Sequence, residues 1–290
     1  MSTETAKRTP DVRTGPVSGG TLVTPSAFGG DLRRLWSLTL TLATTEFKLR
    51  YLGSLLGYAW SLLRPLLFFG VLYVVYTQIL KVSSGPHYGV YLLTNIILWT
   101  FFLEVTNTSI SCLVAREGLL RKMRFPRLAI PLSVCLAASF TLVMNLVVVV
   151  IFALVNGVHP GLTWLEMPVI VVLWGVLALG VGMILSVLFV RMRDVQPIWD
   201  VFSQILFYGS PLIYTLSRYP AGVQRYALIN PVGTLATQTA HAFVDPSYMS
   251  ARQVMGGTVW LLAPVAVAVA IVGFGLWLFV SRAPLIAEHL

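Results

Sequence analysis

Six long apolar stretches, separated by shorter polar segments, occupy most of the chain after residue 56. They run over about 57–80, 90–114, 128–155, 167–190, 199–216 and 258–280. Most reach the roughly 17 to 25 residues that a helix needs to cross a bilayer about 30 Å thick. The pattern predicts an all-α integral membrane protein with six transmembrane helices and both termini on one side.

The stretch 32–52 has a different pattern of polar and apolar positions. Arg33, Ser37, Thr41, Thr44 and Lys48 fall on one stripe of a helix, and apolar residues spread over the other side. This arrangement is typical of an amphipathic helix that lies in the membrane interface. A short spanning helix is the alternative, which the charges at both ends of the stretch disfavour because they leave too little uncharged length.

Residues 1–31 are rich in Ser, Thr, Pro and Gly and contain no apolar run, so we expect a disordered cytoplasmic tail. A six-helix transmembrane domain is expected over 53–285. The segment 217–257 mixes Pro-Ala-Gly, Asn-Pro and Asp-Pro with semi-apolar pieces. We expect short external helices that re-enter the membrane between the fifth and sixth spans. A plain surface loop is the alternative.

Composition and charge agree with a membrane class. The chain is 57% hydrophobic and only 11% charged, with a net charge of +9 and a mean hydropathy of +0.81. With the N-terminus in the cytosol, 16 Lys and Arg residues lie on cytoplasmic segments and 4 on external ones. The positive-inside rule therefore predicts that both termini are cytoplasmic. Headgroup contact and orientation explain these cations better than nucleic-acid binding does.

Ingredients for catalysis or for ATP binding are missing from the sequence. No Gly-Lys dipeptide occurs, so the chain contains no Walker A loop. The four histidines, His87, His159, His241 and His289, show no metal-ligand spacing. We therefore expect neither a metal site nor a cofactor in this chain, and an enzyme or a passive channel is disfavoured.

Glu104 is an acidic residue inside the second apolar stretch and needs a reason to be there. A carboxylate in lipid is costly unless it is paired or hydrated. Glu104 has a functional role if it lines a water-accessible path or pairs with a charge across a helix interface. The alternative is a position near the outer membrane interface, where water reaches it. The sequence leaves these alternatives open.

Aromatic and hydroxyl side chains share helix faces in the first and fifth apolar stretches. Such a mixture suits sugar rings, whose C–H faces are apolar and whose rims form hydrogen bonds. Ordinary helix packing and interfacial aromatic belts are the alternative. The positions are Phe69, Tyr73 and Tyr76 in the first stretch and Ser203, Phe207, Ser210 and Tyr214 in the fifth.

A series of motifs resembles a known family. "FKLRYLGSLLGYAWSLLRPLL" (47–67), "LWTFF" (98–102), "LVAREGLLRKMRFPRLAIPLS" (113–133), "LFVRMRDVQPI" (188–198), "FYGSPLIY" (207–214) and "LINP" (228–231) are similar, in order and spacing, to the transmembrane subunit of ABC-type polysaccharide exporters. The resemblance runs from about residue 45 to 285. It leaves the N-terminal tail outside.

The resemblance implies a homodimer of six-helix subunits in the bacterial plasma membrane. Two separate nucleotide-binding subunits would bind ATP and Mg²⁺ and drive export of a glycan linked to a polyprenyl diphosphate. The aromatic positions above would then contact sugar. Lys48, Arg50 and Arg64 would meet the lipid diphosphate, or else simply anchor helices against anionic lipid. A permease for drugs or small lipids is the alternative function.

The segment 115–131, between the second and third apolar stretches, concentrates cations. Apolar residues interleave them until Pro126 ends the helical pattern. A short amphipathic helix of this kind docks into a groove on another protein. We expect this segment to be the coupling helix that contacts the ATPase. Its residues are Arg116, Glu117, Leu119, Leu120, Arg121, Lys122, Met123, Arg124 and Phe125.

Overall fold

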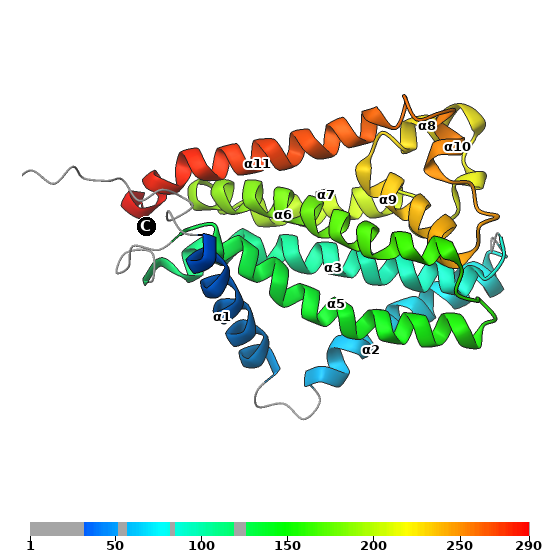
Figure 1. Cartoon of the computed structure of the whole chain (residues 1–290), viewed down its shortest axis with the longest axis horizontal. Helices are drawn as coiled ribbons and strands as arrows, with labels where there is room; N and C mark the ends of the chain where they lie inside the picture. Colours follow the sequence, from blue (N-terminus) through cyan, green and yellow to red (C-terminus); the bar gives the residue numbers. More distant parts are fainter. Residues whose placement is uncertain (1–31, 52–56, 82–84, 119–125, 290) are drawn as a thin grey trace, which may run out of the picture.

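The computed structural model describes residues 32–51, 57–81, 85–118 and 126–289, and every regular element in these ranges is a helix (Figure 1). Five of these helices are long and apolar enough to cross a membrane: Ala59–Ile79, Tyr88–Ala115, Ala129–Val155, Leu162–Arg191 and Leu262–Arg282. The all-helical, multi-pass character predicted from the apolar pattern is therefore confirmed.

The long elements follow the chain in order. They are α1 (Leu32–Tyr51), α2 (Gly57–Val74) with the π-helical turn η1 (Val75–Ile79), α3 (Tyr88–Ala115), α5 (Ala129–Val155), α6 (Met167–Arg191), α7 (Val195–Gly209) and α11 (Leu262–His289). The short elements are η2 (Leu162–Glu166), η3 (Leu216–Arg218), α8 (Ala221–Ala227), α9 (Pro231–Thr239), η4 (Ala240–Val244) and α10 (Ala251–Met255).

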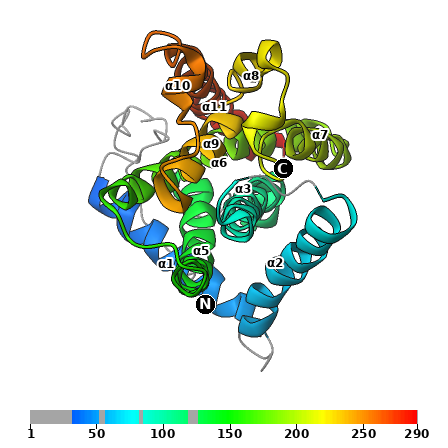
Figure 2. The same ribbon diagram turned by 90° about the vertical axis from the view of Figure 1, so that its right-hand side faces the viewer.

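Helix α3 forms the centre of the bundle, between α5, α6, α2 and α7 (Figure 2). Its apolar residues are spread around the helix, which is typical of a largely buried helix, and 78% of its most apolar window is buried. Helix α2, at the edge, has only 6% of its window buried. Its apolar surface is left for lipid or for another protein.

Glycines allow α6 to approach its neighbours closely. A Cβ atom added to Gly180 would lie 2.9 Å from the Cα of Val272 in α11. On another face of α6, a Cβ added to Gly182 would lie 2.7 Å from Oγ of Ser109 in α3. Small residues at such positions are how membrane helices gain packing contacts without a hydrophobic driving force between them.

The predicted fifth span needs a correction. The sequence pattern placed it over 199–216, but α7 runs from Val195 to Gly209, only 15 residues. Ser210 is extended, with φ −101° and ψ 154°, because the ring of Pro211 disfavours helical geometry in the residue before it. Helix α7 is thus shorter than the five candidate spans, and the six-span topology stays a prediction.

Helix α1 matches the predicted amphipathic element and lies across α5 (Figure 1). Arg33, Ser37, Thr41, Thr44 and Lys48 are all exposed, as their common stripe predicts. On the opposite side Thr39 and Ala43 are buried, and the ring of Phe47 meets that of Phe140 edge-on at a centroid distance of 5.5 Å. The packed face of α1 therefore belongs to the helix bundle.

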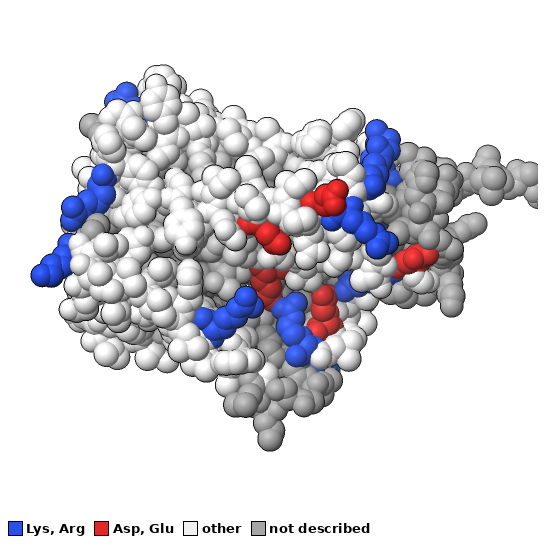
Figure 3. All heavy atoms as spheres, turned by 180° about the vertical axis from the view of Figure 1, so that it is seen from behind, with Lys and Arg blue, Asp and Glu red and all other residues white. Residues whose placement is uncertain are grey.

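Between α7 and α11, short helices gather at one end of the bundle (Figure 2). Helix α9 buries Val232 and Ala236 and packs against α6, α11 and α3. The sequence predicted short helices in this segment, and they are present; whether they re-enter a membrane stays a prediction. The face drawn in Figure 3 carries Lys and Arg side chains at one end, and a mixed group of Lys, Arg, Asp and Glu side chains around its middle and towards the other end.

Candidate functional site

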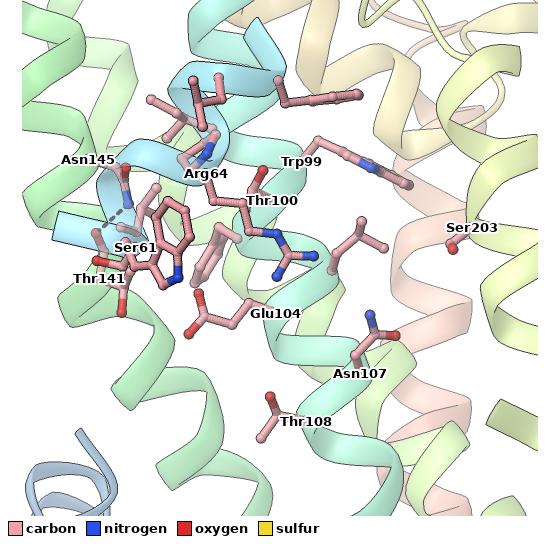
Figure 4. A pocket seen from close by; sticks show the side chains of 18 of the residues that line it. Ser61, Arg64, Trp99, Thr100, Glu104, Asn107, Thr108, Thr141, Asn145 and Ser203 are labelled. Atoms are coloured by element: carbon pink, nitrogen blue, oxygen red, sulfur yellow. Dashed lines mark hydrogen bonds between the residues drawn. The ribbon is translucent and has the colours of Figure 1, made fainter. Parts of the chain in front are cut away.

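A cavity of about 1430 Å³ lies between α2, α3, α5 and α7, with Arg50 of α1 at its wall. Figure 4 shows labelled side chains from these helices around it. Its lining is mixed rather than purely apolar, although α2, α3 and α5 are each long and apolar enough to cross a membrane. A cavity of this kind among membrane helices is a natural place for a polar cargo.

Aromatic side chains line part of the wall. Trp99 of α3 is buried and packs on Phe207 of α7 at a centroid distance of 5.5 Å. Phe207 in turn contacts Phe68 of α2 at 6.0 Å. Trp60 and Tyr208 also line the cavity and are 63% and 56% exposed. Exposed rings in a concave site offer flat apolar faces to a ligand.

Hydroxyl and amide groups line the same cavity. Four of these polar residues share one face of α3. Glu104, Asn107 and Thr108 follow Thr100 by four, seven and eight residues, which is the spacing of one helix face. Helix α2 adds Ser61. Further polar lining comes from Thr141 and Asn145 of α5 and from Ser203 and Gln204 of α7.

The charged residues of the described lining are Arg50, Arg64 and Glu104. The guanidinium of Arg50 pairs with the carboxylate of Glu104, joining α1 to α3. The side chains of Arg50 and Glu104 are 32% and 19% exposed, so the pair is open to the cavity. Arg64 points into the same cavity from α2 (Figure 4). Among the alternatives for Glu104, pairing across a helix interface is the one observed.

The predicted sugar-contacting residues divide into two groups. Ser203 and Phe207 line the cavity. Phe69 instead packs on Tyr73 and on Phe152 of α5, at centroid distances of 5.5 and 5.6 Å, and Tyr76 packs against the buried core. Because a helix turns about 100° per residue, the face of α2 that lines the cavity carries Phe68 and not Phe69.

Ser210 and Tyr214 serve the broken end of α7. Ser210 Oγ accepts a hydrogen bond of 2.8 Å from the amide of Asn230, and Asn230 Oδ1 caps α9 by accepting from the Val232 N–H at 3.0 Å. The hydroxyl of Tyr214 donates to the carbonyl of Tyr208 at 2.6 Å. The residues after the helix are thereby held without helical hydrogen bonds.

Further tyrosines complete this arrangement. The hydroxyl of Tyr91 donates to the carbonyls of Pro211 and Tyr214 at 2.6 and 3.1 Å, and that of Tyr88 donates to Ile213 at 2.8 Å. At the outer edge of the cluster, burial raises the pKa of the Tyr219 hydroxyl above its usual range, so it remains a protonated donor at neutral pH. The tyrosines satisfy carbonyls that the break in α7 leaves without partners.

The predicted diphosphate-contacting residues are only partly brought together. Arg50 and Arg64 share the cavity, whereas Lys48 is exposed on α1 and is not part of the described lining. One signal in the sequence could have found more of the site. The polar positions 100, 104, 107 and 108 interrupt an otherwise apolar helix with a helical period, as Ser61 and Arg64 do on α2.

The predicted ATPase-contacting segment is described only at its start. Arg116 donates to Glu46 of α1 at 2.6 Å and to Ser133 of α5 at 2.9 Å. It therefore braces three helices inside the subunit. Glu117 is also described, at the end of α3. The other predicted positions, Leu119, Leu120, Arg121, Lys122, Met123, Arg124 and Phe125, lie outside the described residues. Within the described part of the chain, no three His, Cys, Asp or Glu side chains come together as a metal site.

A family model described as "ABC-2 type transporter" matches residues 37–238. The chain belongs to the ABC-2 type transporter family. The matched range includes most of α1, the cavity helices α2, α3, α5 and α7, and most of α9. All described residues that line the cavity lie within the matched range.

Curated relatives of this ABC-2 type chain are named as export permease or transport proteins. It is 28% identical over 216 residues to an O-antigen export system permease protein RfbA from Klebsiella pneumoniae, covering 74% of this chain and 83% of the relative. It is 26% identical over 262 residues to RfbA from Myxococcus xanthus, covering 90% and 98%. It is 24% identical over 210 residues to the polysialic acid transport protein KpsM from Escherichia coli, covering 71% and 80%. The resemblance inferred from the motifs is confirmed.

Proposed function

We propose that this chain is the permease subunit of an ATP-driven exporter that moves a polyprenyl-diphosphate-linked polysaccharide from the cytosolic leaflet across a bacterial plasma membrane. The observation that carries the proposal is the mixed lining of the cavity. Exposed Trp60 and Tyr208 alternate with amides and hydroxyls, and two arginines lie at the same wall. Rings accept the C–H faces of sugars, amides and hydroxyls bind their rims, and guanidiniums bind phosphate.

The size of the cavity favours a glycan over a drug or a small lipid. Drug-sized sites hold about 300 to 1,000 Å³, whereas this cavity holds about 1430 Å³ and carries polar side chains from each of its four helices. The names of the curated relatives, O-antigen export and polysialic acid transport, point to the same class of cargo.

Energy must come from another subunit, because the sequence has no Walker A loop. We propose two copies of a nucleotide-binding ATPase that hold ATP and Mg²⁺ and contact residues 116–125. A second copy of this chain completes the path. The exposed apolar surface of α2, which borders the cavity beside α7, supports that arrangement.

The test is to purify the permease together with its ATPase from the native host in mild detergent and to identify bound lipids by mass spectrometry. We expect a polyprenyl diphosphate that carries sugars. The Phe207→Ala variant, which removes a ring from the cavity wall, should retain less of it. Recovery of ordinary phospholipids alone, at the level of an unrelated membrane protein, would contradict the proposal.

A further inference from the structure

Two ion pairs join α1 to α3, and they have different surroundings. Glu46 and Arg116 form a one-to-one pair at 2.6 Å, and Ser133 occupies a further donor of the guanidinium at 2.9 Å. Arg50 and Glu104 form the second pair at the wall of the cavity. In the pair of Glu46 and Arg116 the two charges cancel and both side chains are mostly buried, as expected of an ion pair with a structural role.

The second pair belongs to a group whose charges do not balance. Arg50 and Arg64 bring two positive charges to the cavity, and Glu104 brings one negative charge. No carboxylate partner of Arg64 occurs among the residues that the structure describes. An unbalanced positive charge among apolar helices is costly unless an anion comes to it.

The attachment of α1 does not depend on Glu104. Thr39 and Ala43 are buried against the bundle, Phe47 packs on Phe140, and Glu46 already binds the end of α3. An additional ion pair that is open to a cavity adds little to this attachment, because solvent-accessible ion pairs contribute little to stability. We therefore look for a role of Glu104 in the cavity rather than in the attachment of α1.

Carboxylate and phosphate use the same fork of the guanidinium, with two parallel N–H donors. A phosphate that enters the cavity therefore competes directly with Glu104 for Arg50. Since Glu104 is tethered, it competes at a high effective concentration. A lipid with one phosphate can bind Arg64 alone. If it binds Arg50 instead, it must displace Glu104 and makes no second contact that offsets this loss. A diphosphate brings a second phosphate for Arg64 while the first binds Arg50, and this added contact compensates for the displacement.

We propose that Glu104 is a displaceable counter-ion of a diphosphate-binding site formed by Arg50 and Arg64. It neutralises Arg50 while the cavity is empty and yields it to the headgroup of a diphosphate-linked lipid. It thereby sets the affinity for that headgroup and selects against lipids with a single phosphate. This inference rests on the proposed function, because it takes the headgroup of the proposed cargo as the ligand.

The experiment measures binding of undecaprenyl diphosphate, undecaprenyl monophosphate and phosphatidylglycerol to the purified permease–ATPase complex in detergent. For the unaltered protein we expect the diphosphate to bind most tightly. Glu104→Gln, which keeps the shape and removes the charge, should raise the affinity for the diphosphate about tenfold, as expected on loss of one competing charge-assisted contact. Glu166→Gln, on a glutamate outside the cavity that accepts from Gln238, is the matched control and should change nothing.

The outcomes separate the two proposals. Equal binding of all three lipids by the unaltered protein would contradict the diphosphate cargo itself. Preference for the diphosphate, with unchanged or weaker binding in Glu104→Gln, would overturn the counter-ion role alone and leave Glu104 as a structural tether. Glu104→Asp keeps the charge but shortens its reach, and should give an intermediate gain. It decides the question if the glutamine variant does not fold.

Discussion

The hydroxyl of Tyr91, in the buried part of α3, donates a hydrogen bond of 2.6 Å to the carbonyl of Pro211, just beyond the end of α7. This contact joins the centre of the bundle to a backbone segment that has lost its helical hydrogen bonds. Unpaired carbonyls among apolar helices are costly, so a side-chain donor from a neighbouring helix stabilises the break. The short α7 and the wall of the cavity depend on such donors.

Tyr91→Phe should destabilise the protein by about 1 to 3 kcal/mol, because it leaves the buried carbonyl of Pro211 without this donor. Thermal unfolding in detergent measures the loss. The control is Tyr226→Phe, since Tyr226 is 70% exposed on α8. Equal stability of the two variants would show that the tyrosine hydroxyl does not hold the end of α7.

Gly275 in α11 lies against α6 so closely that an added Cβ would meet the carbonyl oxygen of Gly180. Gly275→Ala should therefore force α6 and α11 apart and lower the thermal stability, by a cost typical of overpacking, about 1 to 3 kcal/mol. Gly273→Ala, two residues earlier in the same helix, is the control, because a Cβ there meets nothing within 4 Å. A tolerated Gly275→Ala variant would contradict the close crossing.

Trp60 should contribute to binding of the cargo. Trp60→Ala removes an exposed ring from the cavity wall and should lower export roughly two- to tenfold, the range expected from one lost ring contact, without lowering thermal stability. Trp260→Ala is matched in exposure, at 61% against 63%, and lies outside the described lining of the cavity. Export that falls equally in both variants would assign the loss to membrane anchoring instead.

The segment between α3 and α5 should transmit the work of the ATPase. Leu120→Asp or Phe125→Asp places a charge among the apolar residues expected to seat in the partner, so ATP hydrolysis should continue while export is lost. The comparison is Leu162→Asp in η2, where the leucine is 87% exposed on the opposite end of the fold. Coupled export at the normal rate in the 120 and 125 variants would exclude this segment as the contact.

The apolar pattern predicted the long helices well and the broken one poorly. For α3, α5 and α6 the predicted and observed bounds agree within two residues, since long apolar runs have few competing structures. The fifth stretch looked continuous to residue 216, but Pro211 and tyrosine donors from α3 end it at Gly209. Those donors come from 120 residues away, and no local pattern reveals them.

The sequence singled out two charged residues of the cavity for different reasons. Glu104 stood out because a charge inside apolar sequence is costly, and Arg64 was implied by the family resemblance; both line the cavity. The sequence pattern predicted that Phe69 faces the cargo, whereas Phe68 is the phenylalanine of α2 that lines the cavity. Two adjacent aromatic residues point about 100° apart, and only packing against α5 decides which one faces the cavity.

Transport in proteoliposomes that contain the permease, its ATPase and a polyprenyl-diphosphate-linked glycan tests the proposed function most directly. We expect the glycan to become accessible to a glycosidase on the far side only with ATP. We also expect transport to stop when the Walker A lysine of the ATPase is replaced. Glycan transport by this chain without the ATPase, or ATP-driven transport of drugs but not of the lipid-linked glycan, would contradict the proposed function.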